Sequence, residues 1–490
     1  MSVERSICPD IYHPAIARDG LLTRLRIPGG RLDAAQCVAI EHLLVSTGLD
    51  YIQVTNRANL QLRALTQDLD RELLAKLADD GLSTGNTAIE GIRNIMLSPT
   101  ARIDAQELID VYPLAEAWDD YLDRHPALGI LSTKFSVGFD GGGSVGIIDR
   151  PNDITLLAIN RHEFSLHLGI GERGSAPLSV GVSLTEAECL PMLTAIAQTY
   201  RQGIVSFGGD ARRKPRLRDV IKRDGLTAFS ELVQREFAGS KRFIFKNLDS
   251  DRRSIRTNSD RHLGVHPQLQ TGNSYLGVVL PLGRWTAEQI KGLGSIVTEY
   301  GSGTLRLTPW QNLIVPDLKT ADVDRVQGLI TDLGLIQTAN HPSSLLRACA
   351  GSTGCQFSAT DTQRDAIDLS NYLAANFTLD YLPDRLCQRP LNIHFSGCEK
   401  SCAQHDRADI TLWGDDRFPD RAGHYRLAID GVTAEFGQDE IDLLPPARVP
   451  ISIGNLLAAY QDRRIDPQES FATFISRQSL AQLQQLLHAV

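Results

Sequence analysis

Four cysteines crowd into one part of the sequence, and their spacing predicts a metal centre. Five residues separate Cys349 from Cys355 and three separate Cys398 from Cys402, with 42 residues between the two pairs. Two short pairs from distant segments can close four thiolates around one centre, as in iron-sulfur proteins. Structural zinc sites instead favour closer pairs in small independent modules. The spacing of this cysteine quartet therefore favours a 4Fe-4S cluster, with zinc and unliganded core cysteines as the alternatives.

Small residues flank the cysteine quartet, so backbone N–H groups can approach the cluster and tune its potential. They are Ala348, Ala350, Gly351, Gly354, Gly397 and Ala403. The other cysteines, Cys8, Cys37, Cys189 and Cys387, are scattered along the chain. This distribution indicates a metal site in a reducing compartment rather than a disulfide framework.

The composition bounds the class of protein. With 490 residues, 42% of them hydrophobic and 22% charged, the chain is that of an ordinary soluble protein with two or more domains. The net charge of -9 argues against a nucleic-acid partner, which needs an excess of Lys and Arg. No segment approaches the roughly 18 apolar residues of a membrane helix, so we expect a cytoplasmic protein without membrane contact.

An internal repeat organises the chain. Residues 28–65 lie without gaps on residues 281–318, at a constant offset of 253. Each copy predicts a strand ending at Pro-x-Gly-Arg, a helix capped by Asp33 or Thr286, a helix stop at Gly48 or Gly301, and a hairpin. Such a β-α-β-β unit is half a ferredoxin-like module. Chance similarity of two α/β units is the alternative.

The repeat continues more weakly beyond these units. Residues 131–140 resemble 392–398, residues 153–158 resemble 409–414, and Arg93 and Arg347 fall at matching places. We therefore expect a duplicated pair, about 1–250 and 251–490. Duplicated halves commonly pack about a pseudo-twofold axis and leave a cleft for a large ligand.

The cysteine motif closely resembles the signature of sirohaem-dependent nitrite and sulfite reductases and of their relative precorrin-3B synthase. The resemblance covers nearly the whole chain and includes the segments TNRANLQLR, IRNIMLSP, LSTKF, RKPRLRD and GVHPQLQTG. It implies an α+β fold of duplicated nitrite/sulfite reductase-like architecture about a pseudo-twofold axis. The expected parts are a ferredoxin-like half domain at 10–75, a cluster-free reductase-like domain with a basic connector at 76–250, a second half domain at 251–325, and a reductase-like domain with the cysteine quartet at 326–490.

Within this superfamily, the sequences of three segments resemble those of precorrin-3B synthase most. They are CPDIYHPAIARDGLLTRLRIPGGRL, KFSVGFDGGG, and CAGSTGC combined with SGCEKSCA. The resemblance then implies an iron-sulfur monooxygenase of cobalamin biosynthesis that converts precorrin-3A to precorrin-3B with dioxygen. The alternatives are a ferredoxin-dependent nitrite or sulfite reductase, and a non-catalytic tetrapyrrole carrier or electron-transfer partner. Ser136 stands where sulfite reductases typically carry a second lysine, which disfavours sulfite.

Three basic residues are the candidates for catalysis. The resemblance implies that Arg57, Arg93 and Lys134 line a basic cleft that faces a tetrapyrrole or an anionic substrate. Arginine suits this role because its guanidinium pairs with carboxylates through two hydrogen bonds. The alternatives for this basic trio are solvated surface side chains, structural ion pairs and, for Lys134, a strand residue facing solvent.

The remaining cofactors and partners depend on the family member. A synthase would add a non-haem iron to the cluster, with ligands that the sequence does not identify. A reductase would carry sirohaem, with Cys402 bridging the cluster to the haem iron. Gly141–Gly146 match G-x-G-x-x-G, but no helix is expected after them, so no nucleotide site is predicted. Electrons should come from an external donor, either ferredoxin or a nicotinamide-dependent reductase.

Overall fold

The computed structural model describes residues 9–172, 174–206, 214–247, 262–377, 391–404, 408–416, 423–430, 441–466 and 469–489. The chain divides into two compact units. The first consists mainly of Leu21–Val278 and Trp285–Gln337, and the second mainly of Thr338–Val490. The described strands form four five-stranded sheets, and the fold is the expected duplicated α+β architecture.

The repeat is confirmed over residues 28–65, where each element of the second copy begins 253 residues after its counterpart. The first copy contains β1 (Ala15–Ala17), β2 (Gly20–Leu25), η1 (Pro28–Gly30), β3 (Arg31–Asp33), α1 (Ala34–Thr47), β4 (Tyr51–Val54), β5 (Leu60–Leu65) and α2 (Arg71–Asp79). The second contains β11 (Gly264–Pro267), β12 (Asn273–Val278), η5 (Pro281–Gly283), β13 (Arg284–Thr286), α7 (Ala287–Tyr300), β14 (Thr304–Leu307), β15 (Leu313–Lys319), η6 (Thr320–Asp322) and α8 (Val323–Asp332).

The helix starts of the two copies agree with the sequence, and one helix end does not. Asp33 and Thr286 each close a capping box on α1 and α7, satisfying backbone N–H groups of the first turn. Gly48 ends α1 in the left-handed conformation at φ 66°. Gly301 ends α7 at φ -118°, and the left-handed residue is Gly303 at φ 71°.

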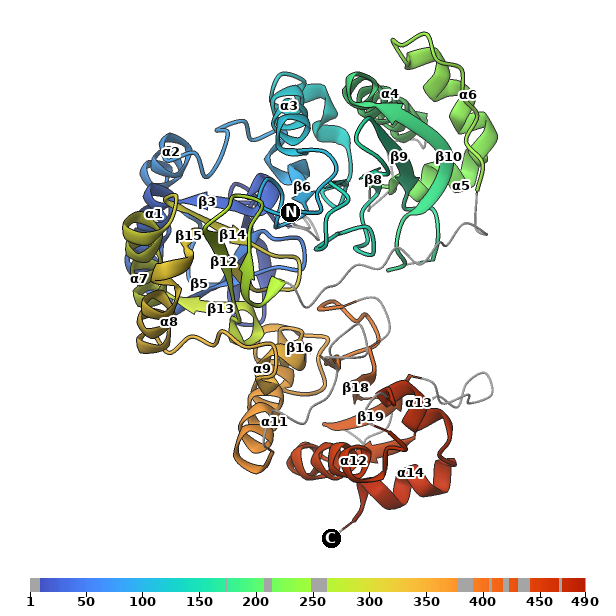
Figure 1. Ribbon diagram of the computed structural model, residues 1–490. Helices are drawn as coiled ribbons and strands as arrows, with labels where there is room; N and C mark the ends of the chain where they lie inside the picture. The colour runs from blue at the N-terminus through green and yellow to red at the C-terminus, as the bar shows by residue number, and fades with distance from the viewer. Residues whose placement is uncertain are drawn as a thin grey trace. The chain divides into compact units, whose positions relative to one another are not determined.

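The two half domains exchange a short strand. One sheet has the order β1-β2-β5-β4-β13 and the other β11-β12-β15-β14-β3, so β3 and β13 each complete the sheet of the opposite copy. The β14–β3 ladder is antiparallel and pairs Thr304 with Asp33 and Arg306 with Arg31. The helices α1 and α7 pack side by side (Figure 1). Each sheet is therefore complete only when both copies are present.

Two further sheets share one topology. In the order β6-β7-β8-β9-β10 the first three strands are parallel and the last two antiparallel, and β16-β17-β18-β19-β20 repeats this pattern. The first set comprises η2 (Glu90–Ile92), β6 (Asn94–Leu97), α3 (Tyr112–Asp123), η3 (Pro126–Ile130), β7 (Ser136–Asp140), β8 (Ile154–Ala158), β9 (Glu163–Leu168), β10 (Leu178–Thr185), α4 (Glu186–Ser206), α5 (Leu217–Asp224) and α6 (Leu226–Glu236). The second comprises α9 (Pro342–Leu345), β16 (Leu346–Ala348), α10 (Gly351–Gly354), α11 (Thr362–Asn376), β17 (Ile393–Ser396), β18 (Ile410–Asp415), β19 (His424–Ile429), β20 (Asp442–Leu444), η9 (Pro446–Arg448), α12 (Val449–Arg463), α13 (Phe471–Ser476) and α14 (Leu480–Leu487).

Strand register corrects one predicted match between the copies. Met96 pairs with Gly138 in the first sheet, whereas Arg347 pairs with His394 in the second. Because β7 and β17 align at an offset of 256 through their pairing with β8 and β18, Arg347 matches Met96 and not Arg93. The proposed correspondence of Arg93 and Arg347 was wrong, since spacing in the sequence does not fix strand register.

Each of these two sheets has its own core. The first packs around Trp118, Phe139 and Tyr200, and the second around Phe395, Tyr425 and Phe474. Of the described helices, none combines the length and apolar composition needed to cross a bilayer.

Candidate active site

The cysteine quartet lies in the second unit, where strand ends and one short helix position it. Cys349 directly follows β16, Cys355 follows α10, and Cys398 lies two residues after β17. The Cys349 N–H donates to the Phe395 carbonyl at 3.1 Å, which ties the first cysteine loop to β17. Parallel pairing of β16 and β17 thus carries cysteines that are distant in the sequence to neighbouring strand ends.

A backbone N–H already points at one sulfur of the quartet. The Gly397 N–H donates to Cys349 Sγ at 3.2 Å. A Cβ atom at Gly397 would lie 1.6 Å from Ser358 Oγ, so only glycine allows this close approach. Amide hydrogen bonds to cluster sulfurs are one means by which proteins tune the reduction potential of an iron-sulfur cluster.

Burial and mutual repulsion in the quartet act against free thiolates. Burial raises the pKa of Cys398, the Lys400 N–H lowers it, and the nearby Cys349 and Cys355 thiolates raise it further. Cys349, Cys355 and Cys398 are half-buried and Cys402 is exposed. The six described cysteines form no disulfide, and Cys8 and Cys387 lie outside the described residues. Positive iron would offset the mutual repulsion of neighbouring thiolates.

The four cysteines could serve one metal ion or a cluster. In the described part of the chain, no group of three or more His, Cys, Asp or Glu side chains could hold one metal ion. Ligands of one zinc all lie within about 2.3 Å of it, whereas a 4Fe-4S cluster spreads its thiolates over separate iron atoms. Ligation of a 4Fe-4S cluster by the quartet therefore stays a prediction, which rests on the spacing of the cysteines.

The basic trio lies in the first unit, and buried asparagines connect its three segments. Arg57 lies in the turn between β4 and β5, Arg93 follows η2, and Lys134 lies in a turn before β7 rather than in the strand. The Asn94 side chain donates to the carbonyls of Thr133 and Phe135, which flank Lys134, at 3.1 and 2.9 Å. It accepts from Asn59 Nδ2 at 3.4 Å. Sequence reasoning missed Asn59 and Asn94, although each lies within two residues of a candidate arginine.

Arg93 is held inside the protein by two carboxylates. Its Nε and Nη2 donate to Asp119 at 2.8 and 2.7 Å, and its Nη1 donates to Glu90 at 3.3 Å. Burial raises the pKa of Glu90, and the Arg93 guanidinium opposes that shift. This geometry matches the structural ion pair that the sequence left open, so an anion must compete with carboxylates for Arg93.

Lys134 lies beside a second ion pair. Arg216, from the basic connector, donates to both carboxylate oxygens of Asp153 at 3.0 Å and to the Lys134 carbonyl at 3.5 Å. The same Asp153 carboxylate accepts from the Ser136 N–H at 3.1 Å. Ser136 is buried, so the side chain at this position is a structural partner of Asp153 and supplies no positive charge.

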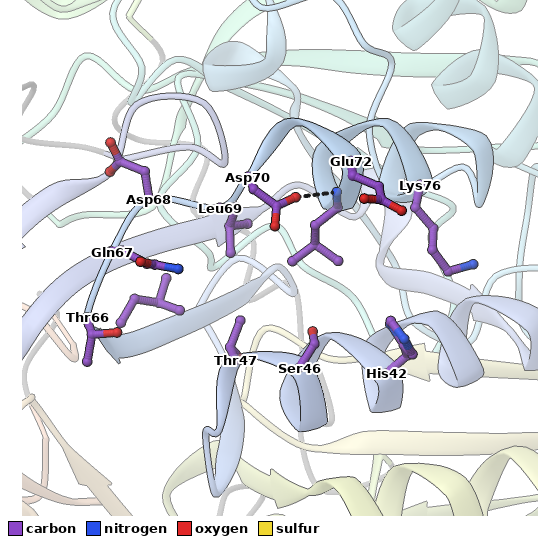
Figure 2. Close-up of a pocket in the computed structure, with 12 residues that line it drawn as sticks. His42, Ser46, Thr47, Thr66, Gln67, Asp68, Leu69, Asp70, Glu72 and Lys76 are labelled. Carbon is purple, nitrogen blue, oxygen red and sulfur yellow. Dashed lines mark hydrogen bonds between the residues drawn. The ribbon is translucent and has the colours of Figure 1, made fainter.

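Two cavities lie within the first unit. One, of about 360 Å³, contains Arg93 and Asp119 in its wall together with Arg26, Arg31 and Tyr112. The other, of about 290 Å³, lies between α1 and α2 (Figure 2). In Figure 2 the side chains of His42 and Lys76 and the acidic Asp68, Asp70 and Glu72 surround this second space. Each cavity has three carboxylates in its wall, but the Arg93 cavity has three arginines to offset them, whereas the second cavity has only Lys76 and His42. The Arg93 cavity is therefore the better candidate site for an anion.

Comparisons with known proteins identify the family of the chain. Residues 13–79 and 266–333 match the nitrite/sulfite reductase ferredoxin-like half domain, and residues 88–241 match the nitrite and sulphite reductase 4Fe-4S domain. A ferredoxin–nitrite reductase of Synechococcus elongatus is 30% identical over 82% of this chain and 78% of its own length. An assimilatory ferredoxin-dependent nitrite reductase of Haloferax mediterranei is 27% identical over 85% and 73%. The Mycobacterium tuberculosis NirA structure shares the fold, with a TM-score of 0.75, 21% identity, and coverage of 94% of this chain and 84% of that one.

The expectation of precorrin-3B synthase was wrong. Relatives that cover most of the chain are named ferredoxin–nitrite reductase, and the monooxygenase reaction with precorrin-3A and dioxygen has no support. Two of the segments that suggested it have structural roles instead. Asp10 accepts from Tyr12 and His13 N–H groups in an N-terminal turn, and Asp140 accepts three loop N–H groups. The sequences of these two segments therefore reflect local folding and not the substrate.

Proposed function

Because the chain belongs to the nitrite and sulfite reductase family, we propose that it is an oxidoreductase that reduces nitrite with sirohaem and a 4Fe-4S cluster. Cys349, Cys355, Cys398 and Cys402 would hold the cluster, and an external donor of the ferredoxin type would supply electrons. The observation that carries the proposal is the Gly397 N–H directed at Cys349 Sγ between two paired cysteine loops. The names of the relatives support the substrate class.

The reaction must balance electrons and protons. Reduction of nitrite to ammonium consumes six electrons and eight protons and releases two water molecules. The bound metal groups would supply the electron-transfer chemistry. The chain itself would supply thiolates for ligation, the Gly397 N–H, and positive charge toward an anion from Arg57, Arg93 and Lys134. Of these three residues, Arg93 lines the cavity of about 360 Å³ and the other two do not. Asn94 holds the loops of these basic residues in register.

One position, Ser136, favours nitrite over sulfite as the proposed substrate. Ser136 stands where a second lysine is typical of sulfite reductases, and its N–H and hydroxyl are bonded to Asp153. A doubly charged sulfite would lack that compensating cation. The singly charged nitrite demands less positive charge.

The first test is an anaerobic absorbance and EPR spectrum, with iron, sulfide and extractable tetrapyrrole counted per chain. We expect haem bands, extractable sirohaem and a cluster signal, and nitrite consumption with reduced ferredoxin. A protein that holds a cluster without sirohaem, or that reduces only sulfite, would contradict the proposal.

A further inference from the structure

Arg93 lines a cavity in which acidic and basic side chains are mixed. The cavity has a volume of about 360 Å³, and all of its lining residues belong to the first unit. The Arg93 side chain is 7% exposed, that of Asp119 is 21% exposed, and that of Glu90 is fully buried. Of the two carboxylates bound to Arg93, only Asp119 lines the cavity.

The hydrogen bonds of Arg93 can be counted. A guanidinium has five N–H groups, and here Asp119 takes one on Nε and one on Nη2 while Glu90 takes one on Nη1. The Asp119 contact is a parallel pair of bonds, the strongest way in which arginine binds a planar anion. Burial works to lower the pKa of Arg93, and the hydrogen bonds and charges of Asp119 and Glu90 together outweigh burial and raise this pKa.

The shape of the Asp119 carboxylate bears on ligand choice. A carboxylate presents two oxygens on a planar centre with one negative charge, and nitrite presents the same arrangement on nitrogen. The Nε/Nη2 edge of Arg93 is thus already matched to a planar two-oxygen anion. Asp119 holds this edge as a tethered competitor, so an incoming anion must first displace it.

We propose that Asp119 is a specificity-determining residue that competes with planar two-oxygen anions for the Nε/Nη2 edge of Arg93. Such a ligand binds when Asp119 turns away into the cavity, while Glu90 keeps the guanidinium in place. The identity of the ligand rests on the proposed function, because either nitrite or a carboxylate arm of the tetrapyrrole has this chemistry. The competition itself follows from the contacts of Arg93.

Removal of the competitor should strengthen binding. Asp119→Asn keeps the size of the side chain and removes its charge, so the repulsion between Asp119 and an incoming anion disappears. A charge removed at hydrogen-bonding distance in a partly buried site should tighten binding of nitrite and formate about tenfold. Asp119→Glu keeps the charge and should stay within about twofold of the parent protein.

The experiment is a calorimetric titration of the purified full-length protein, as isolated, with sodium nitrite and with sodium formate. Each variant is also compared by its thermal midpoint and by extractable tetrapyrrole per chain. Glu469→Gln is the matched control, because Glu469 accepts two bonds from Arg477 in the second unit. This control should leave anion binding unchanged.

The outcomes separate the sources of the ligand. Tighter binding of both small anions in Asp119→Asn supports competition with a free anion, whereas higher tetrapyrrole retention at unchanged nitrite affinity supports competition with a carboxylate arm. Equal or weaker binding with equal retention overturns the inference. If Asp119→Asn does not fold, Arg93→Lys decides, because loss of the planar edge should weaken binding or retention at least tenfold. The titration needs no electron donor, so failure of nitrite turnover alone would reject only the proposed function.

Discussion

The sheets β6–β10 and β16–β20 have the same strand order, yet they complete the loop after their second strand differently. In the first sheet, Asp140 ends β7 and accepts the N–H groups of Gly142, Ile147 and Ile148 at 3.0, 2.6 and 3.0 Å. In the second, Ser396 occupies the matching position, and the following Gly397 N–H donates to Cys349 Sγ.

The difference shows how one topology gives a loop closed by its own carboxylate and a loop whose N–H faces a cysteine sulfur. A buried carboxylate satisfies the loop N–H groups of the first sheet from within the chain. The corresponding loop of the second sheet directs a donor at a thiolate, which suits a bound cluster. The two loops can therefore be tested separately.

The largest expected effect is loss of the cluster from the second sheet. Cys398→Ser should remove most of the bound iron and sulfide, because a serine hydroxyl is a poor ligand for iron in a cluster of thiolates. Counting iron per chain measures this loss. Cys37→Ala is the control, since Cys37 packs against Gly294 in the first unit and should keep its iron at a stability cost of about 1 to 2 kcal/mol. Full iron in Cys398→Ser would refute the assigned ligation.

The next effect compares two glycines at matching positions. A Cβ atom at Gly141 would lie 2.5 Å from Glu107 Oε1, and one at Gly397 would lie 1.6 Å from Ser358 Oγ. Both alanine variants should lose about 2 to 3 kcal/mol in denaturant unfolding, and only Gly397→Ala should lose iron. Gly328→Ala in α8 meets nothing within 4 Å and should gain up to about 1 kcal/mol. Equal iron loss in Gly141→Ala and Gly397→Ala would show that the two loops are not independent.

A smaller effect is expected from the buried carboxylate of the first sheet. Asp140→Asn removes the charge that holds three N–H groups and should lower the free energy of unfolding by about 2 kcal/mol without loss of iron. Asp70→Asn, at the exposed N-cap of α2, should change stability little because Asn also caps helices. If Asp140→Asn leaves the free energy of unfolding unchanged, the loop is held by its other contacts.

The smallest effect concerns pH. Burial raises the pKa of Glu107, next to the first loop, to about 7. A raised folded pKa favours the protonated form, so this stabilisation is complete below about pH 4.5 and is lost as the pH rises through 7. Parent stability should fall by on the order of 1 to 2 kcal/mol between pH 5 and 8 relative to Glu107→Gln. If the free energy of unfolding in urea changes with pH in the same way in the parent protein and in Glu107→Gln, Glu107 is not the source of the pH dependence.

The sequence predicted the duplicated fold because its signals were local. The offset of 253 placed two helix N-caps and two hairpins. The superfamily resemblance predicted the cluster, with sirohaem for the reductase alternative. The exchange of β3 and β13 was missed, because a three-residue strand carries no sign of its distant partner. Asp119 was missed because it lies 26 residues from Arg93, on the surface of a helix where a carboxylate is ordinary.

The choice of family member failed for a related reason. Asp10 and Asp140 gave distinctive wording to the segments that suggested a synthase, yet both serve as acceptors for nearby backbone N–H groups. Similar turns need similar residues whatever the enzyme does. The link from Asn94 to the Lys134 loop, by contrast, joins residues 39 apart in the sequence, which a local pattern does not reveal.

The exchanged strands also constrain how the protein is made. Asp33 cannot find its partner Thr304 until 271 further residues have left the ribosome. Until then β3 is an unpaired edge, which invites association with other nascent chains. Contacts of such long sequence separation slow folding. Biogenesis should therefore depend on chaperones, and a fragment that stops before α7 should aggregate more than the whole chain.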